Sequence, residues 1–174
     1  AFFFIIAINL NAATITSATL CVNGDDTTEV WLNGNNMGIF DYVNWDSASP
    51  VPCVNVPVAY LNATGGNVIA ALNRDTAGGE IYSSWILNVT YSDGKHAYMS
   101  SDDGVKLNTS TYNCSAPPAA DWYQPSYNHS SWGDSVIVTG TTWGKQMFDP
   151  GSGKRIRMRS YDAMASASGH QCLF

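Results

Sequence analysis

The chain has 174 residues, a formal net charge of −6 and only 13% charged residues. This length suits one domain with a substantial core, and the negative charge makes nucleic acid a poor partner. No apolar run reaches the roughly 18 to 20 residues that a membrane helix needs, so membrane insertion is not expected. Glycine, asparagine, serine and threonine are plentiful, which favours short strands and tight turns over helices.

In chain order, the apolar patterns predict strands at residues 2–10, 18–22, 54–61, 67–73, 85–91, 95–100 and 136–138. The first of these is apolar on both faces; the core of a signal peptide is the alternative, but no basic region precedes it. Pro57 removes one backbone donor and therefore marks its strand as an edge strand. Residues 39–52 and 109–127 are expected to be loops.

A β-hairpin is predicted over residues 29–38. Asn33 and Gly34 form the commonest two-residue hairpin turn, because a type I′ turn requires positive φ at both central positions. In the strand that precedes the turn, Val30 and Leu32 share one face of the sheet, and Glu29 and Trp31 share the other.

Five short motifs follow one another along the chain: DDTTEVWLNG at 25–34, GNVIA at 66–70, YSDG at 91–94, SDD at 101–103, and Trp122 followed by YNHSSW at 127–132. This series resembles the galactose-binding-like jelly-roll modules that accompany glycoside hydrolases, above all the accessory β-sandwiches of α-L-rhamnosidases. The resemblance covers residues 3–144 and implies an all-β jelly-roll sandwich. Where that family has paired aspartates before Ser-x-Trp, this chain has Asn128 and His129.

The predicted organisation is therefore a jelly-roll β-sandwich at residues 1–144 and a short basic C-terminal extension at 145–174. The first part carries twelve acidic and three basic residues, whereas the extension carries two acidic and five basic ones. Basic and apolar residues alternate over 154–159, as in a half-buried strand. A short helix is predicted from Ser160 to Gly169.

The extension is expected to pack on the body of its own chain or on a neighbouring subunit. In a strand over 154–159, three arginines share one face: Arg155, Arg157 and Arg159. An acidic body and a basic tail are complementary surfaces, and complementary surfaces on one chain can assemble head to tail into a filament. These arginines are the predicted self-association residues.

Cysteines and glycosylation sequons both point to secretion. The four cysteines are an even number, which favours two disulfides, and sequence alone leaves all three pairings open: Cys21, Cys53, Cys114 and Cys172. Five Asn-x-Ser/Thr sequons are predicted glycosylation sites: Asn62, Asn88, Asn108, Asn113 and Asn128.

Neither catalysis nor a cofactor is expected. The adjacent acid pairs at 25–26 and 102–103 would point to opposite faces of a strand, whereas sugar hydrolysis needs two carboxylates facing one bond. No G-x-S-x-G motif is present. A metal is not assigned, because there is no C-x-x-C and the histidines show no ligand spacing with any cysteine.

One predicted loop combines aromatic rings with amide and carboxylate groups, the mixture that sugar sites use. Its candidate carbohydrate-binding residues are Asp41, Tyr42, Asn44, Trp45 and Asp46. The alternative is that its aromatic rings fold over the edge of the core. The other tryptophans are assigned to the core: Trp31, Trp85, Trp122 and Trp132.

Together these features predict a secreted, extracellular, glycosylated and non-catalytic module that binds a glycan ligand. The alternative is a structural subunit of an extracellular filament or coat, whose partners are neighbouring copies of itself.

Overall fold

The computed structural model describes residues 13–24, 26–44, 47–63, 66–74, 82–100, 111–112, 120–128, 133–134, 136–138, 158–160 and 171–173. For Tyr82, for 111–112 and for every described residue after 128, only the backbone is described. Within these residues the secondary structure is strand, apart from one 3-10 turn, η1 (Val58–Tyr60). No helix in the described part is long and apolar enough to cross a membrane.

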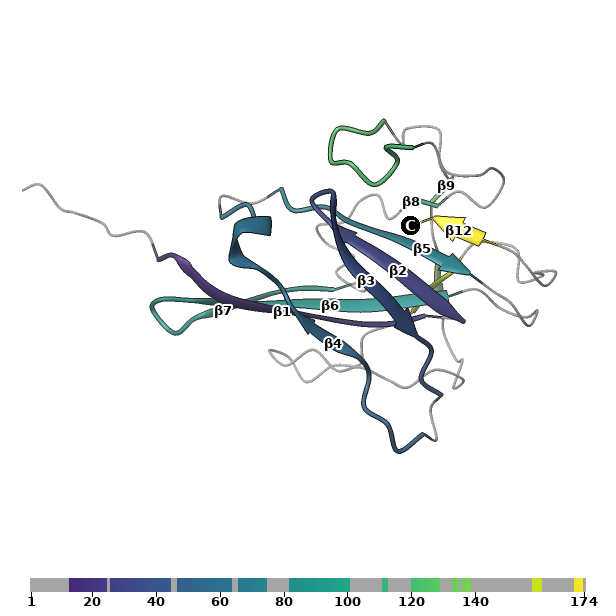
Figure 1. Ribbon diagram of the computed structural model, residues 1–174, viewed down its shortest axis with the longest axis horizontal. Helices are drawn as coiled ribbons and strands as arrows, with labels where there is room; N and C mark the ends of the chain where they lie inside the picture. Colours follow the sequence, from purple (N-terminus) through teal and green to yellow (C-terminus); the bar gives the residue numbers. More distant parts are fainter. Residues whose placement is uncertain are drawn as a thin grey trace, which may run out of the picture.

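Two antiparallel sheets contain most of the strands (Figure 1). Sheet A has the order β10 (Val136–Val138), β11 (Met158–Ser160), β6 (Tyr82–Tyr91), β1 (Ile15–Gly24) and β4 (Cys53–Asn55), and β7 (His96–Ser100) pairs with β6. Sheet B has the order β12 (Gln171–Leu173), β5 (Ile69–Arg74), β2 (Thr27–Leu32) and β3 (Asn35–Asp41). A separate pair is formed by β8 (Thr111–Tyr112) and β9 (Gly133–Asp134).

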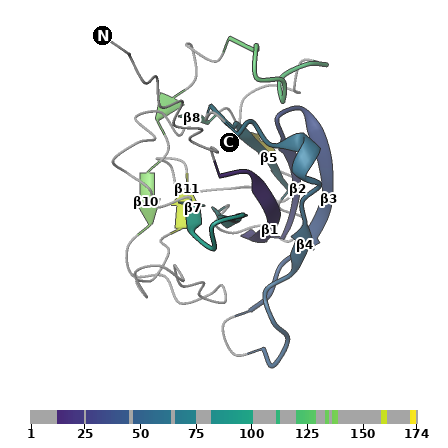
Figure 2. The same cartoon turned by 90° about the vertical axis from the view of Figure 1, so that its left-hand side faces the viewer.

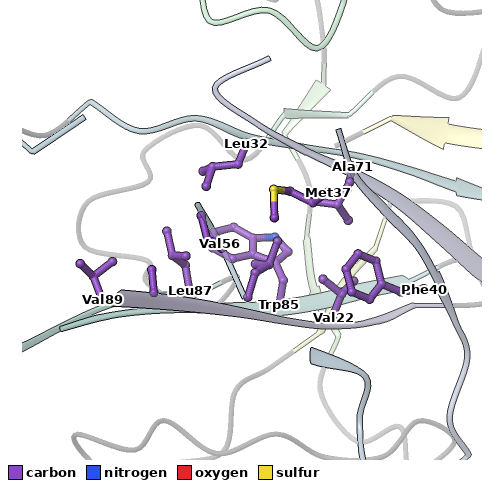
Figure 3. Packing of buried hydrophobic residues seen from close by; sticks show 12 residues of the cluster. Val22, Leu32, Met37, Phe40, Val56, Ala71, Trp85, Leu87 and Val89 are labelled. Carbon is purple, nitrogen blue, oxygen red and sulfur yellow. The ribbon is translucent and has the colours of Figure 1, made fainter. Parts of the chain in front are cut away.

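The two sheets pack face to face, so the chain is an all-β sandwich, as the sequence predicted (Figure 2). Sheet A contributes alternate residues of β1 and β6 to the interior, including Leu20, Leu87 and Trp85. Sheet B contributes residues such as Leu32 and Met37, which Figure 3 shows above the side chains of sheet A. This alternation is what a strand with one buried face requires.

The predicted hairpin is confirmed as β2 and β3. Asn33 and Gly34 have φ of 49° and 81°, the positive values that the turn requires. β3 runs on to Asp41, so the prediction that a loop starts at residue 39 was wrong. The register shifts between Val30 and Trp31 of β2, opposite Gly38, which has a φ of 112°. Such a bulge interrupts the alternation from which strands are read.

Asn33 also ties the hairpin to a distant part of the chain. Its amide nitrogen donates to the Tyr60 carbonyl and to Asn67 Oδ1, at 2.7 and 2.8 Å. Its Oδ1 accepts the Val68 N–H at 2.8 Å. Asn67 in turn accepts the Asn62 N–H at 2.7 Å. Two of the sequence motifs, those containing Asn33 and Asn67, therefore hold each other in place through side-chain amides.

Several other strands agree with the predictions in place but not in length. The edge strand expected over 54–61 is β4, which lies at the end of sheet A but stops at Asn55. Pro57 has a φ of −57° and precedes η1, whose Tyr60 N–H donates to the Pro57 carbonyl at 2.9 Å. In the loop predicted at 109–127, β8 forms a short strand, because it finds a partner in β9.

Both described strands of the C-terminal extension pair within the same chain. β11 lies between β10 and β6, and β12 pairs with β5. Ser160 is the last residue of β11, and residues 161–169 of the helix predicted from it lie outside the described residues. The backbone of this serine pairs with Val136 and with Tyr82 of the same chain. The strand expected at 2–10 lies outside the described residues.

Cys21 and Cys53 form a disulfide. They are directly opposite each other on β1 and β4, with Cα atoms 4.0 Å apart. The bridge therefore fastens the short edge strand β4 to its neighbour β1 and closes a loop with a sequence separation of 32, which contains the whole hairpin. The side chains of Cys114 and Cys172 lie outside the described part.

Candidate functional site

The face of sheet B that points away from sheet A carries a second buried cluster, made of aromatic rings. Trp31 of β2 packs there against Ala70 and Leu72 of β5, and Trp122 covers them. The segment that contains Trp122, residues 120–128, is drawn in green in Figure 1 and lies on this side of the sheet. We call this surface the outer face of sheet B.

Within the cluster, the rings differ in how far a ligand could reach them. Trp31 and Trp122 are 8% and 6% exposed, so both are structural, as the sequence predicted. Tyr123 stacks on Trp31 with ring centroids 5.1 Å apart and planes at 15°. Tyr123 and Tyr127 are half-buried at the margin of the cluster. The tyrosines are therefore the rings that a bound molecule can touch.

A row of polar side chains crosses three strands beside these rings. Arg74 of β5 donates from Nη2 to Glu29 Oε2 at 2.9 Å, and Asn36 of β3 donates from Nδ2 to Glu29 Oε1 at 3.0 Å. Asn36 is exposed, and the side chains of Arg74 and Glu29 are 32% and 19% exposed. Glu29 and Trp31 are two residues apart on one face of β2, about 7 Å along the strand.

The loop predicted to bind carbohydrate begins at the end of the same face. Asp41 is the exposed last residue of β3, and it pairs with Thr27, which pairs on its other side with Arg74. The backbone at Val43 is held by Asn23, whose amide side chain both accepts from and donates to it, at 2.9 and 3.1 Å.

Three of the five predicted binding residues are described: Asp41 at the end of β3, and Tyr42 and Asn44 in the segment that follows it. Tyr42 is half-buried and Asn44 is exposed. Trp45 and Asp46 lie outside the described residues. The binding role of this loop remains a prediction, but its first residue adjoins the polar row.

The described sequons differ in their surroundings. Asn62 and Asn128 are exposed, in turn or loop segments. Asn88 lies in the middle of β6, between Thr19 and Tyr98 of the neighbouring strands. It is half-buried and faces away from sheet B, because its neighbours Leu87 and Val89 point into the core. The sequons at Asn108 and Asn113 lie outside the described part.

Of the three predicted self-association residues, Arg159 is the one that the structure describes. Its backbone pairs with Ile137 and Ser83 of the same chain. Arg155 and Arg157 lie outside the described residues. In the described part of the chain, no group of three or more His, Cys, Asp or Glu side chains is placed to hold a metal ion.

The sequence missed most of the outer face of sheet B as a site. It placed Glu29 and Trp31 on the same side of one strand, but it gave no sign that β5 lies beside β2 with Arg74 opposite Thr27. Nor did it show that residues 120–128 fold back over that strand. Long-range pairing of this kind leaves no local pattern in the chain.

Comparison with known proteins gives no relative for this arrangement. No protein-family model matches the chain, and no curated protein and no solved structure matches it.

Proposed function

We propose that this chain is a secreted, glycosylated and non-catalytic module that binds carbohydrate, and that its sandwich is a jelly roll of the galactose-binding-like kind. The observation that carries the proposal is the outer face of sheet B, where accessible tyrosine rings lie beside an amide, a carboxylate and a guanidinium. Sugars are bound by such mixtures, since an aromatic ring covers the apolar face of the pyranose and polar groups bind its hydroxyls.

Two further features support secretion and glycosylation. The Cys21–Cys53 disulfide suits an oxidising compartment. Exposed sequon asparagines at Asn62 and Asn128 leave room for a glycan to project into solvent. Asn88 is the least suitable of the described sequons, since its Oδ1 is buried.

A glycan array probed with the oxidised, intact chain tests the proposal. Binding should be lost in Tyr123→Ala, because the exposed side of this ring is where a sugar would stack. Tyr98→Ala is the matched control: Tyr98 is also half-buried and stacked, but on His96 at the far side of sheet A. Retained binding in Tyr123→Ala, or equal loss in both variants, would remove the outer face of sheet B as the site.

The filament alternative makes a different prediction for the same material. A head-to-tail assembly should grow with protein concentration and weaken as salt rises, because exposed charges are screened beyond about 8 to 10 Å at physiological ionic strength. Light scattering that increases with concentration, combined with an array that shows no binding, would favour the structural subunit over the binding module.

A further inference from the structure

The polar row on the outer face of sheet B is electrically compensated. Glu29 and Arg74 form an ion pair at 2.9 Å, and the second carboxylate oxygen of Glu29 accepts the Asn36 amide. Asn36 is itself fixed, since its Oδ1 accepts the Gly38 N–H at 2.7 Å. The row is therefore held in one arrangement by contacts from three strands, and its Glu29–Arg74 pair has no net charge.

Arg74 still offers donors to a ligand. An arginine has five N–H groups, and one of them contacts Glu29 among the described residues. With a side chain that is 32% exposed, Arg74 can donate to oxygen atoms that approach from solvent. Glu29 holds the guanidinium in place and cancels its charge.

The surroundings of Arg74 disfavour an anion. Asp41 is exposed and occupies the same cross-strand row, two strands away through Thr27. A carboxylate that approached Arg74 would meet the charge of Glu29 directly and that of Asp41 nearby, and juxtaposed like charges are unfavourable. Hydroxyl groups carry no such penalty, because they accept from Arg74 without a charge of their own.

The aromatic rings supply the other half of the site. Tyr123 lies on Trp31, and Trp31 is two residues from Glu29 on the same face of β2. That spacing is about 7 Å, which the length of a disaccharide covers. A glycan that stacks on Tyr123 and extends along β2 past Trp31 and Glu29 would meet the polar row, where Arg74 offers donors to its hydroxyls.

We infer that the outer face of sheet B selects an uncharged glycan, and that the Glu29–Arg74 pair is the element that excludes acidic sugars. This inference rests on the proposed carbohydrate-binding function and adds the class of ligand. In this inference the Glu29–Arg74 salt bridge determines which glycan binds, whereas the Tyr123 ring contributes affinity. Separate substitutions can therefore test the two roles.

The test compares neutral oligosaccharides with the same oligosaccharides oxidised at C6 to uronates, using the intact oxidised chain. The wild type should bind the neutral members at least about tenfold more tightly than the uronates. Glu29→Gln removes the compensating charge while keeping a similar shape. It should raise uronate affinity by about tenfold and make that binding weaken as salt rises.

Asp93→Asn is the control for charge alone, because Asp93 lies in an exposed turn of sheet A and its removal changes the net charge equally. It should leave the ratio of neutral to uronate affinity unchanged. Arg74→Gln should weaken neutral binding without any gain for uronates, and this result is expected even if Glu29→Gln fails to fold.

The outcomes separate the inference from the function beneath it. A wild type that prefers uronates, or a folded Glu29→Gln variant with an unchanged ratio, overturns the neutral-glycan inference and leaves carbohydrate binding in place. A folded wild type that binds neither series removes the carbohydrate-binding proposal and the inference with it.

Discussion

Sheet B buries hydrophobic side chains on both faces, and the two faces do so in different ways. Its inner face contributes Val30 and Leu32 to an interior closed by a whole second sheet, and both side chains are 0% exposed. Among the described residues, its outer face buries Trp31 beneath residues 120–128 and leaves half-buried tyrosines at the margin. The outer face therefore keeps accessible rings and polar neighbours, which a closed interior cannot.

This difference is the basis on which we propose a binding role for one side of β2, while the other side belongs to the core. Trp31 and Leu32 are consecutive, so β2 supplies both surfaces by alternation alone. The interior is mostly aliphatic, with buried Trp85 and Phe40 among its members. The outer cluster has an ion pair and an amide next to it, which suit a ligand better than they suit a core.

The largest effect is expected for Leu32→Ala. The side chain is fully buried between the sheets, and its truncation leaves a cavity that should cost about 2 to 5 kcal/mol of the free energy of unfolding. Tyr123→Ala, at the margin of the outer face, should cost only roughly 1 kcal/mol. Denaturant melts of the two variants measure the contrast, and equal losses would show that the two faces do not differ as described.

The disulfide should stabilise both faces together. Its loop, with a sequence separation of 32, contains the whole β2–β3 hairpin, so its loss should lower the free energy of unfolding by about 2 to 4 kcal/mol. The Cys21→Ala/Cys53→Ala double variant measures this by denaturant melts under oxidising conditions. Free thiols at these two positions in the unfolded, unreduced protein would contradict the bridge.

The hairpin turn offers a sharper probe of the covering segment. Gly34 and Gly94 have nearly the same φ, 81° and 79°, so replacement by alanine should cost each about 1 to 2 kcal/mol of backbone strain. At Gly34 the new Cβ would also lie 2.5 Å from Oε1 of Gln124, whereas at Gly94 it meets nothing within 4 Å. Gly34→Ala should therefore be the more destabilising of the two.

Adding Gln124→Ala separates the strain from the clash. If residues 120–128 lie against the hairpin as described, Gln124→Ala should recover the extra loss of Gly34→Ala and should not affect Gly94→Ala. Denaturant melts of the four variants form the test. Identical losses at the two glycines would mean either that the amide end of Gln124 turns aside at no cost or that it does not lie against Gly34.

The sequence predicted those features that depend on neighbouring residues, and it missed those that depend on pairing between distant segments. Asn33-Gly34 specifies its turn locally, and the alternation that follows from it placed Trp31 and Leu32 on opposite faces. The end of β3 was missed because the bulge at Gly38 breaks the alternation, and β8 because a short strand exists only through its partner.

The sequence predicted a binding role for residues that adjoin the outer face of sheet B, and this role stays a prediction. Asp41 was recognised because aromatic, amide and acidic residues are adjacent in the chain after it. Glu29, Arg74 and Tyr123 are far apart in sequence and are brought to one face by sheet pairing and by the fold of 120–128. Such a constellation has no local pattern, so sequence reasoning proposed only the neighbouring loop and not this surface.

The smallest effect on the free energy of unfolding is expected in the exposed turn between β6 and β7. There the Lys95 ammonium lies 2.7 Å from Asp93 Oδ2 and lowers the pKa of that carboxyl below its ordinary value of 3.8, and the Lys95 backbone N–H adds a second bond to Oδ1. The same contact raises the pKa of Lys95 above 10.5. The pair therefore makes its full contribution to stability between pH 3.8 and pH 10.5, the ordinary pKa values of the two groups. It is lost as pH falls through the lowered pKa of Asp93, and as pH rises through the raised pKa of Lys95.

An NMR titration of the Asp93 carboxyl distinguishes the two contacts, because Lys95→Ala removes the ammonium and keeps the backbone N–H. The pKa of Asp93 should rise in this variant but stay below 3.8, since the backbone bond from residue 95 remains. Denaturant melts at pH 7 should scarcely change, as expected for an exposed pair. A large loss of stability would show that this turn is packed against other parts of the chain. The turn could then not serve as the exposed site with which the two faces of sheet B are compared.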